Sequence, residues 1–225
     1  MRIPDPVYPS VVHMLAHVVH AARGGARVEA LVCGERRLDY GEYASCVAGF
    51  ARELRGLGAR GERVATLLGN SIEACVAAYG VLAAGAQHVP LNPLYSPREL
   101  EFMLRDAAPR VLIVDAALES TVAPLAAAAG VAHIIAVGQG RRLLDAWRAE
   151  GIALAELPGR EDLALLQYTG GTSGRAKGVN LTHGAIATNV SQREGLLPTR
   201  AGGADPVHDA GLACLRHGDG VVPRA

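Results

Sequence analysis

The chain has 225 residues, half of them hydrophobic, with 22 basic and 22 acidic side chains and a formal net charge of zero. This length suits one large α/β unit or two small ones, and the composition supports a substantial core. The balanced charge argues against nucleic acid and against an anionic membrane surface as partners.

The cysteines lie far apart and form no C-x-x-C pair, which is typical of free thiols in a reducing cytosol. No signal peptide opens the chain. Residues 74–97 lack Asp, Glu, Lys and Arg, but glycines and prolines interrupt them. They therefore predict a buried helix and a strand, with no integral membrane span. We expect a cytoplasmic protein.

The first predicted elements are a β-hairpin at residues 28–40, turning at Gly34-Glu35, and a helix. Apolar residues of this helix, Tyr43 to Leu57, recur at spacings of four and three. Further along, the expected elements alternate: strand 63–68, helix 72–84, strand 87–91, helix 97–106, strand 110–115, helix 117–129, strand 132–137, short helix 143–149 and strand 163–168.

This alternation of apolar strands with helices predicts an α/β fold, with a mostly parallel sheet covered by helices on both faces. Local start signals support the helices. Asn70 or Ser71 is suited to cap one of them, and Ser96-Pro97-Arg98-Glu99 is a capping box with proline at the first helical position.

A glycine-rich stretch, Y-T-G-G-T-S-G-R-A-K-G, follows the last of these strands at Tyr168–Gly178. Its glycines let backbone N–H groups approach an anion, and its hydroxyls and Lys177 add donors suited to phosphate. It is not a Walker A loop, because Lys177 is followed by glycine and the spacing differs. The alternative is a flexible surface loop that is rich in Gly and Thr only by composition.

The stretch resembles the phosphate-binding signature Y-T-S-G-T-T-G-x-P-K-G-V of the adenylate-forming enzymes, which include acyl-CoA synthetases, peptide-synthetase adenylation domains and luciferases. L-D-Y-G-E-Y at 38–43 and V-L-A-A-G-A-Q-H-V-P-L-N-P-L-Y at 81–95 resemble two further family motifs, in the same order. The resemblance covers roughly residues 5–197 and is closest to long-chain fatty acyl-CoA synthetases.

The resemblance implies that a carboxylate and ATP give an acyl-adenylate, which coenzyme A converts into a thioester. It implies that the loop holds the β- and γ-phosphates, with Lys177 as the catalytic cation. The loop residues carried over are Thr169, Gly170, Gly171, Thr172, Ser173, Gly174 and Lys177. Ser173 and Ala176 replace the usual threonine and proline without removing a donor.

Other candidates are histidines and a tyrosine. The resemblance suggests that His183 lines the acyl or nucleotide site, and the alternative is a helix-start histidine with Thr182 as cap. Tyr168 either borders the substrate pocket or ends the strand. His13, His17 and His20 lie on one side of an expected helix, where a polar helix edge is favoured over a metal site.

The resemblance also implies that ligands of Mg²⁺, the ribose-binding aspartate, the coenzyme A tunnel and the C-terminal domain with its adenylation lysine lie outside this chain. We expect residues 1–197 to be the N-terminal portion of an AMP-binding domain. Residues 198–225 lack periodicity. One base shift with chosen codons gives family-like strings there, so we interpret this tail as an out-of-frame segment.

The resulting interpretation is a truncated fatty acid–CoA ligase, inactive or very weak on its own and prone to self-association through exposed core. One alternative is an adenylating enzyme for an aryl or amino acid. Another is a non-catalytic remnant that binds a nucleotide or a partner.

Overall fold

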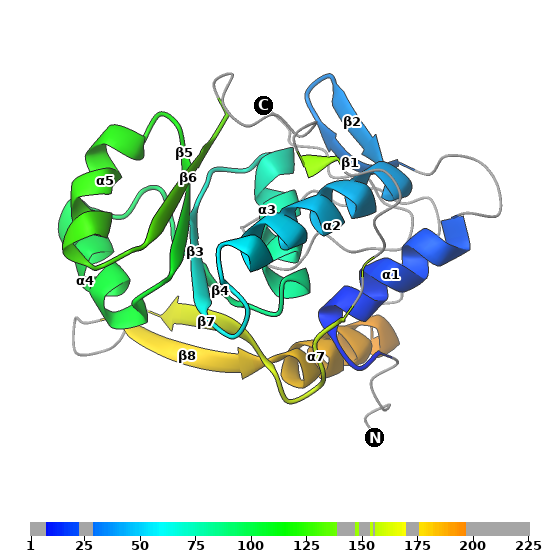
Figure 1. Ribbon diagram of the computed structural model, residues 1–225. Coiled ribbons are helices and arrows are strands. Elements are labelled where there is room, and N and C mark those ends of the chain that lie inside the picture. Colours follow the sequence, from blue (N-terminus) through cyan, green and yellow to red (C-terminus); the bar gives the residue numbers. More distant parts are fainter. Residues whose placement is uncertain are drawn as a thin grey trace.

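The computed structural model describes residues 8–22, 29–138, 147–148, 154, 156–169 and 176–196. In this part of the chain a central sheet lies between two groups of helices (Figure 1). The helices are α1 (Val11–Ala22), α2 (Tyr40–Gly56), α3 (Ile72–Ala83), α4 (Pro97–Ala107), α5 (Glu119–Ala128) and α7 (His183–Leu196). The strands are β1 (Glu29–Cys33), β2 (Arg36–Asp39), β3 (Arg63–Leu67), β4 (Gln87–Pro90), β5 (Val111–Asp115), β6 (His133–Val137), β7 (Leu163–Thr169) and β8 (Lys177–Thr182).

The main sheet has the strand order β6-β5-β3-β4-β7-β8. Its first five strands run parallel, and β8 is antiparallel to β7. The predicted mostly parallel sheet with helices on both faces is therefore confirmed. The antiparallel edge strand is new, because the sequence pattern predicted no strand after the glycine-rich stretch.

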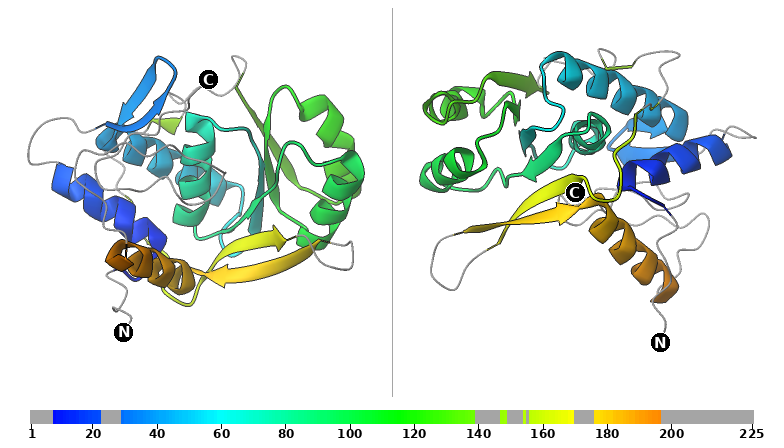
Figure 2. Two further views of the ribbon diagram at one scale, coloured as in Figure 1. Left: turned by 180° about the vertical axis from the view of Figure 1, so that it is seen from behind. Right: turned by 60° about the horizontal axis from the view of Figure 1, so that its bottom comes forward.

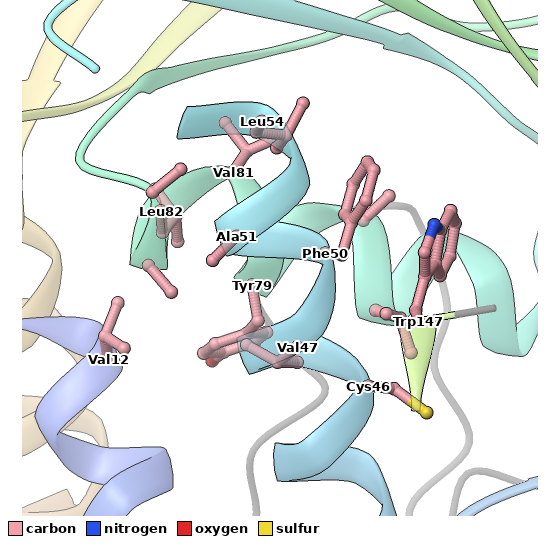
Figure 3. Packing of buried hydrophobic residues seen from close by; sticks show 14 of the residues in the cluster. Val12, Cys46, Val47, Phe50, Ala51, Leu54, Tyr79, Val81, Leu82 and Trp147 are labelled. Atoms are coloured by element: carbon pink, nitrogen blue, oxygen red, sulfur yellow. The ribbon is translucent and has the colours of Figure 1, made fainter. Parts of the chain in front are cut away.

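One face of the sheet is covered by α2 and α3, which pack closely on each other (Figure 2). Figure 3 shows side chains of α2, including Val47 and Leu54, lying against α3. Phe50 stacks on Trp147 with ring centroids 4.2 Å apart, and both rings are buried. Apolar burial on this scale is the dominant favourable term in folding, so this layer is the main core.

The opposite face carries α4 and α5. The apolar stripe of α4, formed by Leu100, Met103 and Leu104, is buried against side chains of β3, β5 and β7. Because strand residues alternate between faces, Leu166 and Tyr168 point towards this layer while Leu165 belongs to the other core. The two faces of β7 thus serve different layers.

The helix N-caps agree with the prediction. Ser96 accepts a hydrogen bond from the backbone N–H of Glu99, and the Glu99 carboxylate accepts one from the backbone N–H of Ser96, which completes the capping box of α4. Ser71 caps α3. A second capping box, between Asp39 and Glu42, starts α2 directly after the β1–β2 hairpin, earlier than the apolar spacing indicated.

The remaining predictions are answered in part. The hairpin at residues 28–40 is confirmed as the antiparallel pair β1–β2. The short helix predicted at 143–149 and the tail at 198–225 lie outside the described residues, apart from residues 147 and 148. Cys33, Cys46 and Cys75 form no disulfide bond in the described part of the chain. Within the described ranges, no helix has the length and apolar character needed to cross a membrane.

Candidate phosphate-binding site

The glycine-rich stretch leaves the sheet at the edge where the parallel strands end. β7 ends at Thr169, and β8 returns from Lys177 in an antiparallel ladder (Figure 1). In open α/β sheets, ligands bind outside the carboxyl ends of the strands. The fold therefore places the two ends of this stretch, Thr169 and Lys177, where a ligand site is expected.

Thr169 and Lys177 form the last pair of this ladder. The hydroxyl Oγ1 of Thr169 is 3.5 Å from the carbonyl oxygen of Lys177, and both residues are exposed. The backbones of a hydroxyl residue and a lysine are thus paired at the point where the two strands leave the ladder. Lys177 is also the only lysine in the sequence. The other predicted phosphate-binding residues lie outside the described residues: Gly170, Gly171, Thr172, Ser173 and Gly174.

Gly178, next to Lys177, has no room for a side chain. A Cβ built there would lie 2.9 Å from Cδ1 of Leu166 and 3.4 Å from Cε1 of Tyr168. Both neighbours are buried. The glycine after the lysine thus leaves room for the side chains of Leu166 and Tyr168, which lie against it from the neighbouring strand β7.

Tyr168, which precedes Thr169, is buried on the α4 face of the sheet. Its hydroxyl donates to Oδ2 of Asp106 at 2.6 Å and also lies 3.3 Å from the carbonyl oxygen of Met103. Burial and the Asp106 hydrogen bond raise the pKa of Tyr168 well above its ordinary value, so the phenol stays a donor. Its role in substrate binding stays a prediction.

His183 lies at the other end of β8 from Lys177. Six strand steps separate the two residues, or roughly 20 Å. The imidazole is 1% exposed, and its Nδ1 has no hydrogen-bond partner among the described residues. Burial lowers the pKa of His183 to about 4; Asp162 acts in the opposite direction and His13 lowers it further.

The alternative interpretation of His183 is confirmed. It is the first residue of α7, and Thr182 Oγ1 accepts a hydrogen bond from the backbone N–H of Ala185, as an N-cap does. The structure thus brings Tyr168, Thr169 and Lys177 together and places His183 at the opposite edge of the sheet. A substrate-binding role for His183 stays a prediction.

The three-histidine cluster of α1 stays untested, because the side chains of His17 and His20 lie outside the described residues. The described His13 is used locally, since its Nδ1 lies 2.7 Å from Oγ of Ser10. No group of three or more His, Cys, Asp and Glu side chains in the described part of the chain is arranged to hold a metal ion.

A family model described as "AMP-binding enzyme" matches residues 18–219. The chain belongs to the AMP-binding enzyme family. The sheet agrees with this assignment: the chain superposes on the complex of VinN with L-aspartate with a TM-score of 0.78 and 25% identity, covering 95% of this chain and 57% of that one.

Relatives in the AMP-binding family act on different acids by name. A long-chain-fatty-acid–CoA ligase of Haemophilus influenzae is 36% identical over 165 residues, 59% of this chain and 29% of the ligase. A 3-hydroxybenzoate–CoA ligase of Aromatoleum is 35% identical over 173 residues, 73% of this chain and 33% of that protein. The chain therefore spans about a third of the length of these curated relatives.

Sequence reasoning missed two residues, Asp106 and Gln87, that contact the strands on either side of the loop. Asp106 lies in the last turn of α4, where the helix dipole disfavours a carboxylate. This unfavourable position could have indicated that Asp106 binds a side chain elsewhere in the fold. Gln87 is a buried polar residue at the start of a short strand. Its partners could not be read locally, because they lie up to 93 positions away.

Proposed function

We propose that this chain is the phosphate-binding part of an adenylate-forming acid–CoA ligase. The parent reaction joins a carboxylate to ATP, releases pyrophosphate, and passes the acyl group to coenzyme A. The observation that carries the proposal is the ladder pair Thr169–Lys177, which stands at the carboxyl edge of a parallel sheet in a member of the AMP-binding family.

The residues at this edge fit a polyphosphate. Lys177 supplies a compact positive charge, and its ladder partner Thr169 carries a hydroxyl that would turn from the Lys177 carbonyl oxygen to a phosphate oxygen. Glycines between them would leave backbone N–H groups accessible to phosphate oxygens. Negative charge grows on the leaving pyrophosphate during adenylation, so donors held in place before reaction would stabilise the transition state. Ligands of Mg²⁺ and the contacts to coenzyme A are proposed to lie mostly outside this chain.

A fatty acid is the proposed acid. Support comes from the fatty-acid ligase of Haemophilus influenzae, which is 36% identical over the matched residues. The aromatic acid named for the Aromatoleum relative, and the aspartate bound to VinN, keep an aryl or amino acid as the alternative. Isotope exchange between pyrophosphate and ATP, run with a fatty acid, 3-hydroxybenzoate and L-aspartate in parallel, would separate these classes.

The first experiment is calorimetric titration of the chain with Mg·ATP. We expect binding, and we expect Lys177→Ala to weaken it at least about tenfold, because hydrogen bonds to charged groups are worth roughly 1.5–3 kcal/mol. Arg52→Ala removes an exposed positive charge on α2, away from the loop, and serves as control. A chain that binds no ATP, or a Lys177→Ala variant that binds as the wild type does, would contradict the proposal.

A non-catalytic protein that binds a nucleotide is the second candidate, because the ladder pair Thr169–Lys177 would serve binding as well as catalysis. ATP binding without pyrophosphate exchange for any acid would favour it. The out-of-frame interpretation of residues 198–225 also remains a proposal. Sequencing of the coding DNA across codons 195–225 in all three frames tests it, and an intact tail homologous to the family in the present frame would defeat it.

A further inference from the structure

A polar network runs across the α4 face of the sheet, beneath an otherwise apolar layer. On one side, Tyr168 donates to the Asp106 carboxylate at 2.6 Å. On the other, Arg63 on β3 donates from Nη1 to the carbonyl oxygen of Ala107, the last residue of α4, at 3.0 Å. Two adjacent residues of α4 thus hold side chains from two strands of the sheet.

The network continues through Gln87 to the edge strand. Arg63 donates from Nε to Oε1 of Gln87 at 3.1 Å. The amide Nε2 of Gln87 then donates to the carbonyl oxygen of Leu165 on β7 at 2.9 Å and to Oδ1 of Asn180 on β8 at 2.8 Å. All three polar functions of this buried amide are therefore satisfied, which is what a low-dielectric interior demands.

These contacts meet at the hairpin that bounds the loop. Tyr168 directly precedes Thr169, and Asn180 lies three residues after Lys177. Strand β7 is thus connected to the end of α4 through Tyr168. Strand β8 is connected to it through Asn180, by way of Gln87 and Arg63. Ordinary helix stability does not explain Asp106, because a carboxylate in the last turn of a helix opposes the helix dipole.

We propose that the end of α4 is a brace for the phosphate site, with Tyr168, Asp106, Arg63 and Gln87 as positioning residues that fix Thr169 and Lys177 relative to each other. The proposal rests on the proposed phosphate-binding function of the loop. The network touches no ligand itself. It acts through β7 and β8. Loss of one of its hydrogen bonds should therefore loosen the pair Thr169–Lys177 without unfolding the protein.

Because Lys177 is the only lysine in the sequence, it can be labelled as a spectroscopic probe. Reductive methylation with ¹³C-formaldehyde labels Lys177 and the terminal amine, and methylation leaves the lysine charge in place. The ¹³C methyl resonance of Lys177 then reports its surroundings with and without Mg·ATP. Amide hydrogen exchange of residues 165–169 and 177–180, measured without ATP, reports how firmly the two strands are held.

The test variants remove one link each. Tyr168→Phe and Asp106→Ala are expected to raise exchange in both strands about tenfold, to shift the Lys177 resonance, and to weaken Mg·ATP binding severalfold. Asp106→Asn keeps an oxygen acceptor for the tyrosine and is expected to restore wild-type behaviour. Tyr43→Phe is the matched control, because it deletes another buried hydroxyl, which donates to the carbonyl oxygen of Cys75 on the far face.

The outcomes separate the two proposals. If the wild type binds no ATP, the proposed function fails, while exchange still decides whether the brace holds the strands. If Tyr168→Phe and Asp106→Ala leave exchange and the Lys177 resonance at wild-type values, the brace is refuted. It is refuted as well if exchange rises but Mg·ATP binds as tightly as before, or if Tyr43→Phe has the same effects.

Discussion

Phe50 on α2 lies directly against Gly80 on α3: a Cβ built at Gly80 would be 2.6 Å from Cδ1 of Phe50 and 3.3 Å from its Cβ. The ring has little freedom to move away, because it stacks on Trp147 and is fully buried. The absence of a side chain at Gly80 is therefore what lets the two helices approach.

We predict that Gly80→Ala destabilises the protein. Helix propensity alone favours alanine by about 1 kcal/mol, while overpacking a core costs typically 1–3 kcal/mol, so the net loss is expected to be on the order of 1 kcal/mol. Urea unfolding followed by circular dichroism measures it. Gly56→Ala, at the end of α2 with nothing within 4 Å, is the control and should stabilise or leave stability unchanged. Equal stabilisation by both changes would disprove the packing argument.

A second prediction concerns pH. His88 on β4 is buried, and its Nε2 lies 2.8 Å from Oγ1 of Thr66 on the neighbouring strand β3. Burial lowers the pKa of His88 from 6.5 to about 4. The unfolded chain thus takes up a proton near pH 6.5 and the folded chain only near pH 4. Stability is therefore full above pH 6.5 and falls as the pH drops through this window.

This effect of His88 should amount to about 2 kcal/mol between pH 8 and pH 5. His88→Gln keeps a polar partner for Thr66 and has no proton to gain, so its free energy of unfolding should fall by less over the same range. Urea titrations of both proteins at the two pH values provide the comparison. Parallel losses in the two proteins would mean that His88 is not the group responsible.

Gly178→Ala should weaken Mg·ATP binding as well as stability. The new methyl group would meet the buried side chains of Leu166 and Tyr168, so these side chains or the backbone of β8 next to Lys177 must shift. We expect severalfold weaker binding and a loss on the order of 1–3 kcal/mol in stability. Calorimetry with Leu166→Val/Gly178→Ala is informative, because removing the methylene should relieve part of the contact. No relief would point away from steric displacement.

Self-association is the last prediction. β8 is an edge strand of the described sheet, and Val179 on it is 45% exposed. Open edges with apolar side chains are templates for pairing, and a charge on the edge blocks it. Sedimentation velocity should show concentration-dependent association that Val179→Glu reduces. Leu94→Glu, in the loop after β4, is the control for added charge; a wild type that remains monomeric at all concentrations would contradict the prediction.

The sequence by itself determined what depends on near neighbours. The capping box at Ser96 and Glu99 spans three residues, and the hairpin at Gly34 is set by a local turn, so both could be predicted and both are confirmed. The glycine-rich stretch identified the family through its own residues, and the family model agrees. Strand and helix order followed from apolar spacing, which is a local property of the chain.

Only the tertiary structure decided which distant groups meet. Tyr168 forms a hydrogen bond with Asp106, 62 positions away in the sequence, and Gln87 forms one with Asn180, 93 positions away. The spacing of apolar residues along the chain does not predict such pairs. The same holds for His183, which follows the loop closely in sequence. Because β8 is an extended strand that runs away from the loop, His183 lies near the start of β7, at the other end of the ladder from Lys177. The distance of His183 from Lys177 is thus set by the extended geometry of β8, and a substrate-binding role for His183 stays a prediction.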